Sequence, residues 1–425
     1  MASMYLDEIV SAQKRGETKG ITSVCSAHPY VIKHTLKVSQ TFRVSPLIEA
    51  TCNQVNQFGG YTGMTPKDFV AYVRGIAEEN NYPFENIMLG GDHLGPNVWQ
   101  NEPAESAMQK SEALIRDYVQ AGFTKIHLDW SMRLADDPLG ALNVELIAKR
   151  AAELAKAAED ALTPNPSPIG RGENAIRYVI GTEVPIPGGA TEREETVSVT
   201  KVEDVEQTIQ VTREAFYREG LQSAWERVIA VVVQPGVEFG DDFVIPYKPD
   251  KAKELSQFIE SQSMIYEAHS TDYQTGDALN NLVRDHFSIL KVGPALTFAF
   301  REAVFALAMM EDELVAKDER SNIIQVLEDV MVKHPEHWKK YYRGDEQEQA
   351  FKRKYSLSDR ARYYWVQPEA QAALARLMEN LGENVLPYSL LSQFAGKVEL
   401  SAEQVIEWKI YNTLKNYLMA SGEFQ

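Results

Sequence analysis

The chain has 425 residues, of which 44% are hydrophobic, and its 43 basic and 61 acidic side chains give a formal net charge of −18. This length predicts one large domain with an appendage, or two domains. The acidic balance argues against a nucleic-acid-binding surface, which needs clustered Lys and Arg. Cys25 and Cys52 form no CxxC metal signature and fit a reducing compartment. We identify no signal peptide and no membrane-spanning run, and we therefore expect a cytoplasmic protein.

Eight short β-branched or apolar runs recur along the chain, and a helix-like segment follows each of them. Strands that alternate with helices predict parallel βαβ units, and eight such units predict an α/β fold of the (β/α)8 barrel type. The rival architecture is a doubly wound open sheet, which would normally carry a GxGxxG or Walker signature; the sequence has neither. The predicted strands are 20–26, 47–50, 87–91, 125–129, 178–182, 228–234, 264–268 and 289–293.

The pattern changes after about residue 295, where helical periodicity and aromatic-rich stretches replace the alternation. We therefore expect a barrel domain over residues 1–295 and a helical C-terminal extension over residues 296–425 that packs on it. A Pro/Gly-rich insertion at about 162–174 interrupts the barrel domain. We favour an exposed insertion there over a mobile lid, because long surface insertions cost little entropy.

The pair Asp92-His93 stands where the third predicted strand passes into a Gly/Pro loop. Adjacent strand residues point to opposite faces, so both side chains can reach one ligand only where the strand ends and the backbone turns. A metal-bound imidazole beside a proton-transferring carboxylate needs that arrangement, and active sites of such barrels lie at the strand ends. The alternative is a helix-capping Asp beside a hydrogen-bonded His.

His93 and His269, after the third and seventh strands, are the best candidates for metal ligands. With Asp92, Glu183 or Glu238 they would form a reactive site that keeps an open position, although each imidazole taken alone fits a hydrogen-bonding role better than a ligand role. We expect His127 to be structural, because it lies inside the fourth strand. Four further histidines lie on helix-like segments and are expected to be uninvolved: His34, His286, His334 and His337.

Ser270, Thr271 and Gly293 follow the seventh and eighth strands, at the usual phosphate position of the fold. A hydroxyl turn that caps the next helix explains Ser270-Thr271 equally well. The Gly-rich segment 57–66 could cover the barrel mouth, or could be a plain connection with Thr65 as helix N-cap. The other polar groups at strand ends, which we expect to bind substrate, are Asn53, Gln54, Asp129, Asp272 and Lys291.

Long motifs spread along the chain carry a family resemblance: 48–51, 53–64, 90–97, 181–185, 233–239, 266–275, 291–299 and 355–360. With them the chain resembles the Z-subunit family of D-tagatose-1,6-bisphosphate aldolase over nearly its whole length. The resemblance implies a TIM barrel of class II aldolase type, with Asp92 as acid/base and with His93 and His269 on the metal. Gln234 stands where those aldolases have a third histidine, so Gln234, Glu183 or Glu238 would complete the ligand set.

The resemblance also implies two functions. One is metal-dependent C4 epimerisation of a ketose or ketose phosphate, of the tagatose 6-phosphate/fructose 6-phosphate type, by retro-aldol/aldol chemistry. The alternative is a non-catalytic Z subunit that supports a class II aldolase subunit, so we expect an oligomer. Zinc is the expected ion, with manganese, cobalt, nickel and magnesium as alternatives, and Glu183 or Glu238 could be a second acid/base. A sugar-phosphate kinase is disfavoured, because no ATP-cradling loop is visible.

Overall fold

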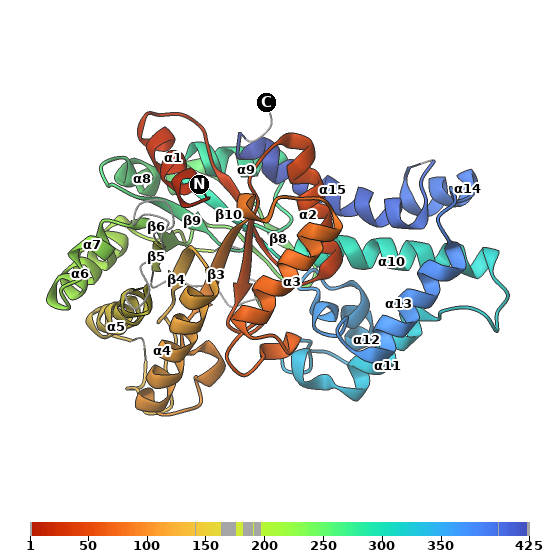
Figure 1. Cartoon of the computed structure of the whole chain (residues 1–425), viewed down its shortest axis with the longest axis horizontal. Helices are drawn as coiled ribbons and strands as arrows, with labels where there is room; N and C mark the ends of the chain where they lie inside the picture. Colours follow the sequence, from red (N-terminus) through yellow and green to blue (C-terminus); the bar gives the residue numbers. More distant parts are fainter. Residues whose placement is uncertain are drawn as a thin grey trace.

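A computed structural model describes residues 2–140, 142–162, 176–181, 190, 197–397 and 399–422 of the chain. In these residues, eight parallel strands close into a barrel in the order β1-β10-β9-β6-β5-β4-β3-β2. Figure 1 shows the strands with helices around them and the C-terminal helices to one side. The strands are β1 (Ile21–Cys25), β2 (Leu47–Thr51), β3 (Met88–Leu94), β4 (Lys125–Leu128), β5 (Arg177–Gly181), β6 (Val228–Val233), β9 (Ile265–Ala268) and β10 (Phe287–Val292). Because β1 pairs with β10, the predicted barrel is confirmed over the open sheet.

Helices on the outside of the barrel cover the strands, as the alternating sequence pattern predicts. Helix α3 begins at Thr65, whose side chain accepts from the backbone N–H of Asp68 in a capping box, with Pro66 at the first helical position. This confirms Thr65 as the predicted N-cap. These helices are α2 (Pro29–Phe42), α3 (Pro66–Glu79), α4 (Ala104–Ala121), α5 (Val144–Leu162), α6 (Val202–Arg218), α7 (Gln222–Trp225), α8 (Pro249–Glu260) and α9 (Gly276–Arg284).

Helix α1 (Ala2–Lys14) lies against the N-terminal end of the barrel. Its Leu6 and Ile9 are buried and pack with interior side chains of the strands, among them Leu47 and Met88. This end of the barrel is therefore filled with apolar side chains. Polar chemistry is left to the opposite end, where the strands have their carboxyl termini.

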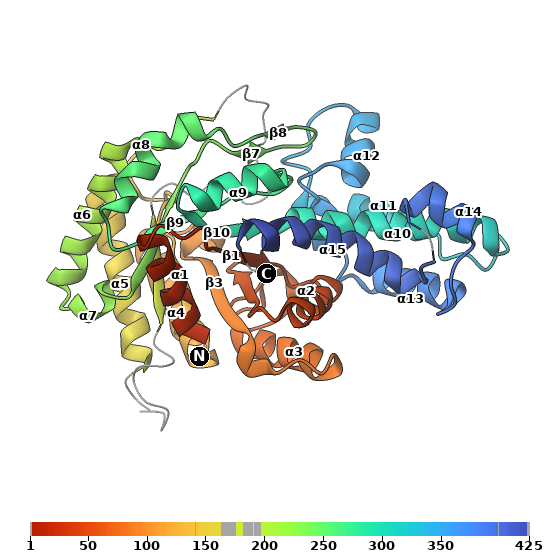
Figure 2. The ribbon, with the colours of Figure 1, turned by 90° about the horizontal axis from the view of Figure 1, so that it is seen from above.

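The C-terminal extension is helical, as predicted. Helix α10 (Pro294–Leu314) runs away from the barrel, and α15 (Ala402–Ala420) runs back beside it (Figure 2). Helix α15 packs against α2, α9 and β1, so the last described helix covers the barrel wall where β10 meets β1. Between α10 and α15 lie α11 (Ile323–Lys333), α12 (Glu346–Tyr355), α13 (Pro368–Leu381) and α14 (Tyr388–Leu390).

Short elements complete the described chain. Strands β7 (Glu238–Phe239) and β8 (Val244–Ile245) form an antiparallel hairpin after β6. The 3₁₀ turns are Gly60–Thr62, Phe84–Asn86, Pro96–Trp99, Pro335–His337 and Arg360–Tyr363, and a π-helical turn spans Leu391–Ala395.

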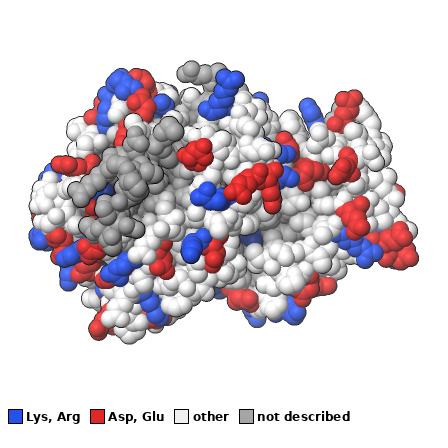
Figure 3. All heavy atoms as spheres, in the orientation of Figure 1, with Lys and Arg blue, Asp and Glu red and all other residues white. Residues whose placement is uncertain are grey.

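Acidic and basic side chains are mixed over the face shown in Figure 3. Among the described helices, none has the length and apolar character that crossing a membrane requires. The predicted insertion at 162–174 lies outside the described residues except for Leu162, which ends α5.

Candidate active site

The Asp92-His93 pair lies on a bulge at the end of β3. The pairing of β3 with β4 shifts register between Gly91 and Leu94, and His93 has a φ of 48°, in the left-handed region that non-glycine residues rarely adopt. Asp92 Oδ1 lies 3.0 Å from His127 Nδ1, and His93 Nδ1 lies 2.9 Å from Asp129 Oδ2. The bulge therefore turns two adjacent side chains toward groups of the neighbouring chain segment, His127 in β4 and Asp129 directly after it, which a regular strand could not do.

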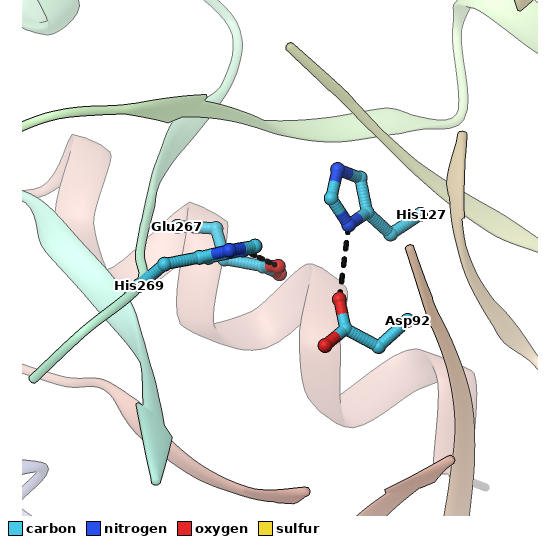
Figure 4. A group of neighbouring side chains, drawn as sticks. All are labelled: Asp92, His127, Glu267 and His269. Atoms are coloured by element: carbon cyan, nitrogen blue, oxygen red, sulfur yellow. Dashed lines mark hydrogen bonds and ion pairs between the residues drawn. The ribbon is translucent and has the colours of Figure 1, made fainter. Parts of the chain in front are cut away.

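Four buried side chains, three from strands and one directly after β9, form an acid–imidazole cluster: Asp92, His127, Glu267 and His269. One ligand atom of each lies within 4.8 Å of the others. In Figure 4, Asp92 and His127 face Glu267 and His269 across a small space. The Nε2 atom of His269 lies 2.9 Å from Glu267 Oε1. This donor set, two imidazoles and two carboxylates, fits a divalent cation.

The structure places His93 beside this cluster. Its ring centroid lies 5.0 Å from that of His269 and 5.3 Å from that of His127, and those two rings are 5.3 Å apart. Three imidazoles thus lie together at the carboxyl ends of β3, β4 and β9. The Asp129 carboxylate, which we expected to bind substrate, instead bonds His93 and the backbone N–H of Ser131.

The expectation that His127 serves the structure alone does not match its position. Its Nδ1 faces Asp92, and its Nε2 is buried without a hydrogen-bond partner among the described residues. A buried polar atom without a partner commonly marks a missing ion or water. The sequence carried a signal for this: Lys125, His127 and Asp129 alternate along the predicted strand 125–129, and every second strand residue faces the barrel interior.

Below the cluster, two buried lysines neutralise the carboxylates, and sequence reasoning missed most of this layer. Lys125 Nζ lies 2.6 Å from Glu49 Oε1 and 2.7 Å from Glu267 Oε2. Lys291 Nζ lies 2.5 Å from Glu49 Oε2 and 2.6 Å from Asp92 Oδ1. Paired charges of this kind are what a barrel interior tolerates.

Gly90 makes room for this layer. It pairs with Glu49 on one side and with Lys125 on the other, and a Cβ atom at Gly90 would lie 2.6 Å from Glu49 Oε1. Because Gly90 has no side chain, the ion pair between Glu49 and Lys125 can form across β3.

The surroundings set the protonation of the cluster. Burial acts to raise the pKa of Asp92, but the charges of His93 and Lys291 outweigh it and hold this pKa well below its usual range. Lys125 and Lys291 have the same net effect on the buried carboxyl of Glu267. Burial lowers the pKa of His269 to about 3. At neutral pH the cluster therefore offers ionised carboxylates and a neutral His269 imidazole, the forms that bind a metal ion.

A pocket of about 690 Å³, counting the space open to solvent, lies at the barrel mouth. Its lining joins the barrel to the C-terminal extension through Arg362 and Tyr363, which the sequence reading did not single out. Nine of the predicted site residues line this mouth pocket: Asn53, Gln54, Asp92, His93, His269, Ser270, Asp272, Lys291 and Gly293.

The predicted phosphate position needs correction, because most of its groups are already bonded within the protein. Asp272 Oδ1 accepts from the backbone N–H groups of Gly293, at 3.0 Å, and Ala295, at 2.8 Å. The Thr271 hydroxyl is fully buried and donates to the Lys291 carbonyl at 2.5 Å. The N–H of Gly293 is therefore already hydrogen-bonded. Of the predicted phosphate-binding residues Ser270, Thr271 and Gly293, Ser270 is the one with a side chain on the mouth pocket.

Two other predicted residues, Gln234 and Glu238, do not reach the cluster. Gln234 Oε1 accepts from the backbone N–H groups of Gly236 and Val237, at 2.8 and 3.0 Å, so its amide bonds its own turn. Glu238 lies in β7, and its carboxylate accepts from the N–H of Phe239 at 2.9 Å. Among the described residues, neither of these side chains lines the mouth pocket. Glu183 lies outside the described residues.

The Gly-rich segment 57–66 reaches the mouth pocket through Tyr61. The Tyr61 ring centroid lies 4.7 Å from that of Tyr363, and His337 stacks on Tyr363 at 4.7 Å. The segment thus bridges the barrel and the C-terminal extension. His337, expected to be uninvolved, supports this contact.

Fold and site define a (β/α)8-barrel protein with a buried acid–imidazole cluster at the carboxyl ends of its strands. Residues 6–422 match the family described as D-tagatose-1,6-bisphosphate aldolase subunit GatZ/KbaZ-like, and the chain belongs to this family.

Named relatives agree with this assignment. The chain is 53% identical to "D-tagatose-1,6-bisphosphate aldolase subunit GatZ" of Salmonella dublin and 52% identical to the protein of that name from Klebsiella pneumoniae. Each match covers 92% of this chain and 90% of the relative. A crystal structure described as a probable tagatose 6 phosphate kinase from Sinorhizobium meliloti 1021 is 44% identical, with a TM-score of 0.86, covering 95% of this chain and 100% of that one.

Proposed function

We propose that this chain binds a divalent metal ion in the acid–imidazole cluster and catalyses C4 epimerisation of a ketose 6-phosphate by retro-aldol cleavage and re-addition. The observation that carries the proposal is the convergence of two imidazoles and two carboxylates within 4.8 Å, beside an open pocket. Zinc suits this donor set best, and manganese, cobalt, nickel and magnesium are the alternatives.

The roles follow from the contacts. Asp92, His127, Glu267 and His269 would hold the ion, which when bound polarises the ketose carbonyl. His93, oriented by Asp129, lies beside them at the mouth pocket. The ammonium of Lys291, held 2.6 Å from Asp92, places a positive charge where an oxygen anion develops during cleavage.

Proton transfer would use the second oxygen of Asp92. That carboxylate accepts the proton of the C4 hydroxyl, the C3–C4 bond breaks, and its electron pair moves toward C2 to give an enediolate and an aldehyde. After the aldehyde turns its other face, C3 attacks it, and Asp92 returns the proton to the new C4 oxygen. No atom is lost, so the product is the C4 epimer. Glu183 and Glu238 remain candidates for a second acid/base group.

The decisive experiment uses the purified chain, stripped of metal with a chelator and then loaded with each candidate ion in turn. Carbon-13 NMR should detect tagatose 6-phosphate forming from fructose 6-phosphate, and the reverse reaction, with at least one ion. If neither reaction occurs with any ion, the epimerase proposal is wrong.

A second candidate function is that of an accessory subunit that supports a catalytic aldolase subunit, and the names of the relatives favour it over the epimerase. Its test is co-expression with a class II tagatose-bisphosphate aldolase subunit. An accessory chain should co-purify with that subunit and raise its activity or its thermal stability, and should still do so as the Asp92→Asn variant. Absence of co-purification would reject this role.

A further inference from the structure

Arg362 projects from the C-terminal extension into the mouth pocket. It belongs to the 3₁₀ turn Arg360–Tyr363, which follows Asp359. The Asp359 carboxylate accepts from the Thr297 hydroxyl of α10 at 2.5 Å and lies 3.8 Å from Arg301. The turn is therefore anchored on α10, the first helix of the extension, and this contact fixes the backbone position of Arg362.

The hydrogen bonds of Arg362 go to neutral acceptors. Its Nη1 donates to the carbonyl oxygens of Ser358 and Asp359, the latter at 3.0 Å, and its Nη2 donates to the Tyr363 hydroxyl at 3.0 Å. Among the described residues, no carboxylate oxygen lies within 4.0 Å of the guanidinium. A guanidinium has five N–H donors, so donors remain for a ligand.

The other positive groups of the mouth pocket are already engaged. Lys291 is paired with Glu49 and Asp92, and Asp272 satisfies the first amides of α10. Of the Lys and Arg side chains that line the pocket in the described residues, Arg362 is thus the one without a carboxylate partner.

The surroundings of Arg362 add positive potential. Arg360 lies two residues before it, with its guanidinium carbon 3.1 Å from the ring centroid of Tyr341 and its Nη1 bonded to the His337 carbonyl. Burial acts to raise the pKa of Tyr363, yet the charges of Arg362 and Arg360 outweigh it and lower that pKa. Two carboxylates act on this side of the pocket, and each has other partners: Asp272 accepts from two backbone N–H groups, and Asp359, whose charge acts on Arg362, lies 3.8 Å from Arg301.

We propose that Arg362 is the specificity-determining residue that binds the terminal phosphate of the substrate, so that the C-terminal extension selects phosphorylated ketoses. Arg forms paired, charge-assisted hydrogen bonds with phosphate oxygens. The acid–imidazole cluster and Arg362 border one pocket, which places the reacting carbons toward the barrel and the phosphate toward the extension. This inference rests on the proposed ketose phosphate chemistry and names the residue that recognises the phosphate.

The kinetic test compares Arg362→Gln and Arg362→Lys with Lys339→Gln, a control that removes an exposed cation of the extension outside the pocket. Arg362→Gln should raise KM for fructose 6-phosphate about 10- to 100-fold, the loss expected for hydrogen bonds to a charged group. It should change kcat/KM for unphosphorylated fructose by less than about threefold. Arg362→Lys, which keeps the charge but not the paired geometry, should fall between. Equal losses on both substrates, or an unchanged KM for the phosphate ester, would overturn the proposal.

A binding test separates this proposal from the proposed reaction. Glucitol 6-phosphate has no carbonyl and cannot turn over, so calorimetry with it reports phosphate recognition alone. If the native chain shows no epimerase activity but binds glucitol 6-phosphate at least about tenfold more tightly than Arg362→Gln does, the phosphate site stands and the epimerase proposal falls. If the two bind it equally, or if the native chain does not bind it, Arg362 is not the phosphate receptor.

Discussion

The Nδ1 atom of His127 lies 3.0 Å from Oδ1 of Asp92, joining an imidazole from the interior face of β4 to a carboxylate on the bulge of β3. The contact leaves the other ring nitrogen of His127 buried and unpartnered among the described residues. The Asp92–His127 pair is therefore central to the acid–imidazole cluster, although His127 lies inside a regular strand.

The first prediction concerns His127 as a metal ligand. His127→Asn should weaken binding of zinc or manganese by more than the roughly 10- to 100-fold that loss of an outer-shell partner costs, because a direct ligand is removed. Calorimetry on the chelator-treated chain measures this affinity. His286→Asn is the matched control, since His286 bonds Gln13 away from the mouth pocket. Equal metal affinity in the two variants would assign His127 a structural role only.

The second prediction concerns proton transfer by Asp92. Asp92→Asn keeps the shape of the side chain but cannot accept the proton, so kcat for epimerisation should fall about 100- to 10,000-fold. Circular dichroism should show an unchanged fold. Asp318→Asn on the exposed surface is the control and should keep full activity. Full activity of Asp92→Asn would exclude Asp92 as the acid/base.

The third prediction concerns the buried charge layer. Lys125→Met removes one of the two buried lysines that pair with Glu49 and Glu267, and the remaining Lys291 also pairs with Asp92, so the free energy of unfolding should fall by about 3–5 kcal/mol. Urea denaturation followed by fluorescence measures the loss. Lys149→Met, at a position whose side chain is 69% exposed, should change stability by less than about 0.5 kcal/mol. Similar stabilities of the two variants would mean that the layer is not held together by Lys125.

The fourth prediction is a pH dependence of the free energy of unfolding that comes from His28. This residue is buried, and its ring centroid lies 4.1 Å from that of Phe300. Burial lowers the pKa of His28 to about 3, below the value of about 6.5 for an unfolded chain. Its contribution to stability is therefore complete above about pH 6.5 and is lost as the pH falls toward 3. Between about pH 7.5 and about pH 5, the His28→Phe variant should lose about 2 kcal/mol less free energy of unfolding than the native chain. Parallel losses in the two proteins would contradict this assignment.

Much of the fold could be predicted from local pattern. The eight strands were recognisable because buried parallel strands are short apolar runs, and the start of α3 because Thr65 and Pro66 are typical of a helix N-terminus. The covering of the barrel wall by α15 was not predictable, because its contacts with α2 and β1 join residues hundreds of positions apart.

The sequence by itself determined the alternation of strands and helices and the side chains available at the strand ends, among them the Asp92-His93 pair and His269. The tertiary structure decided which groups meet. Barrel closure brings His127 and Glu267 to Asp92 and lets the Asp272 carboxylate accept from the Gly293 N–H. The packing of the C-terminal extension on the barrel places Arg362 at the mouth pocket. The physical reason is that the local sequence pattern shows which residues are buried and which face of an element they lie on. Which side chains meet depends on strand register, on bulges and on the packing of helices that are distant in the sequence.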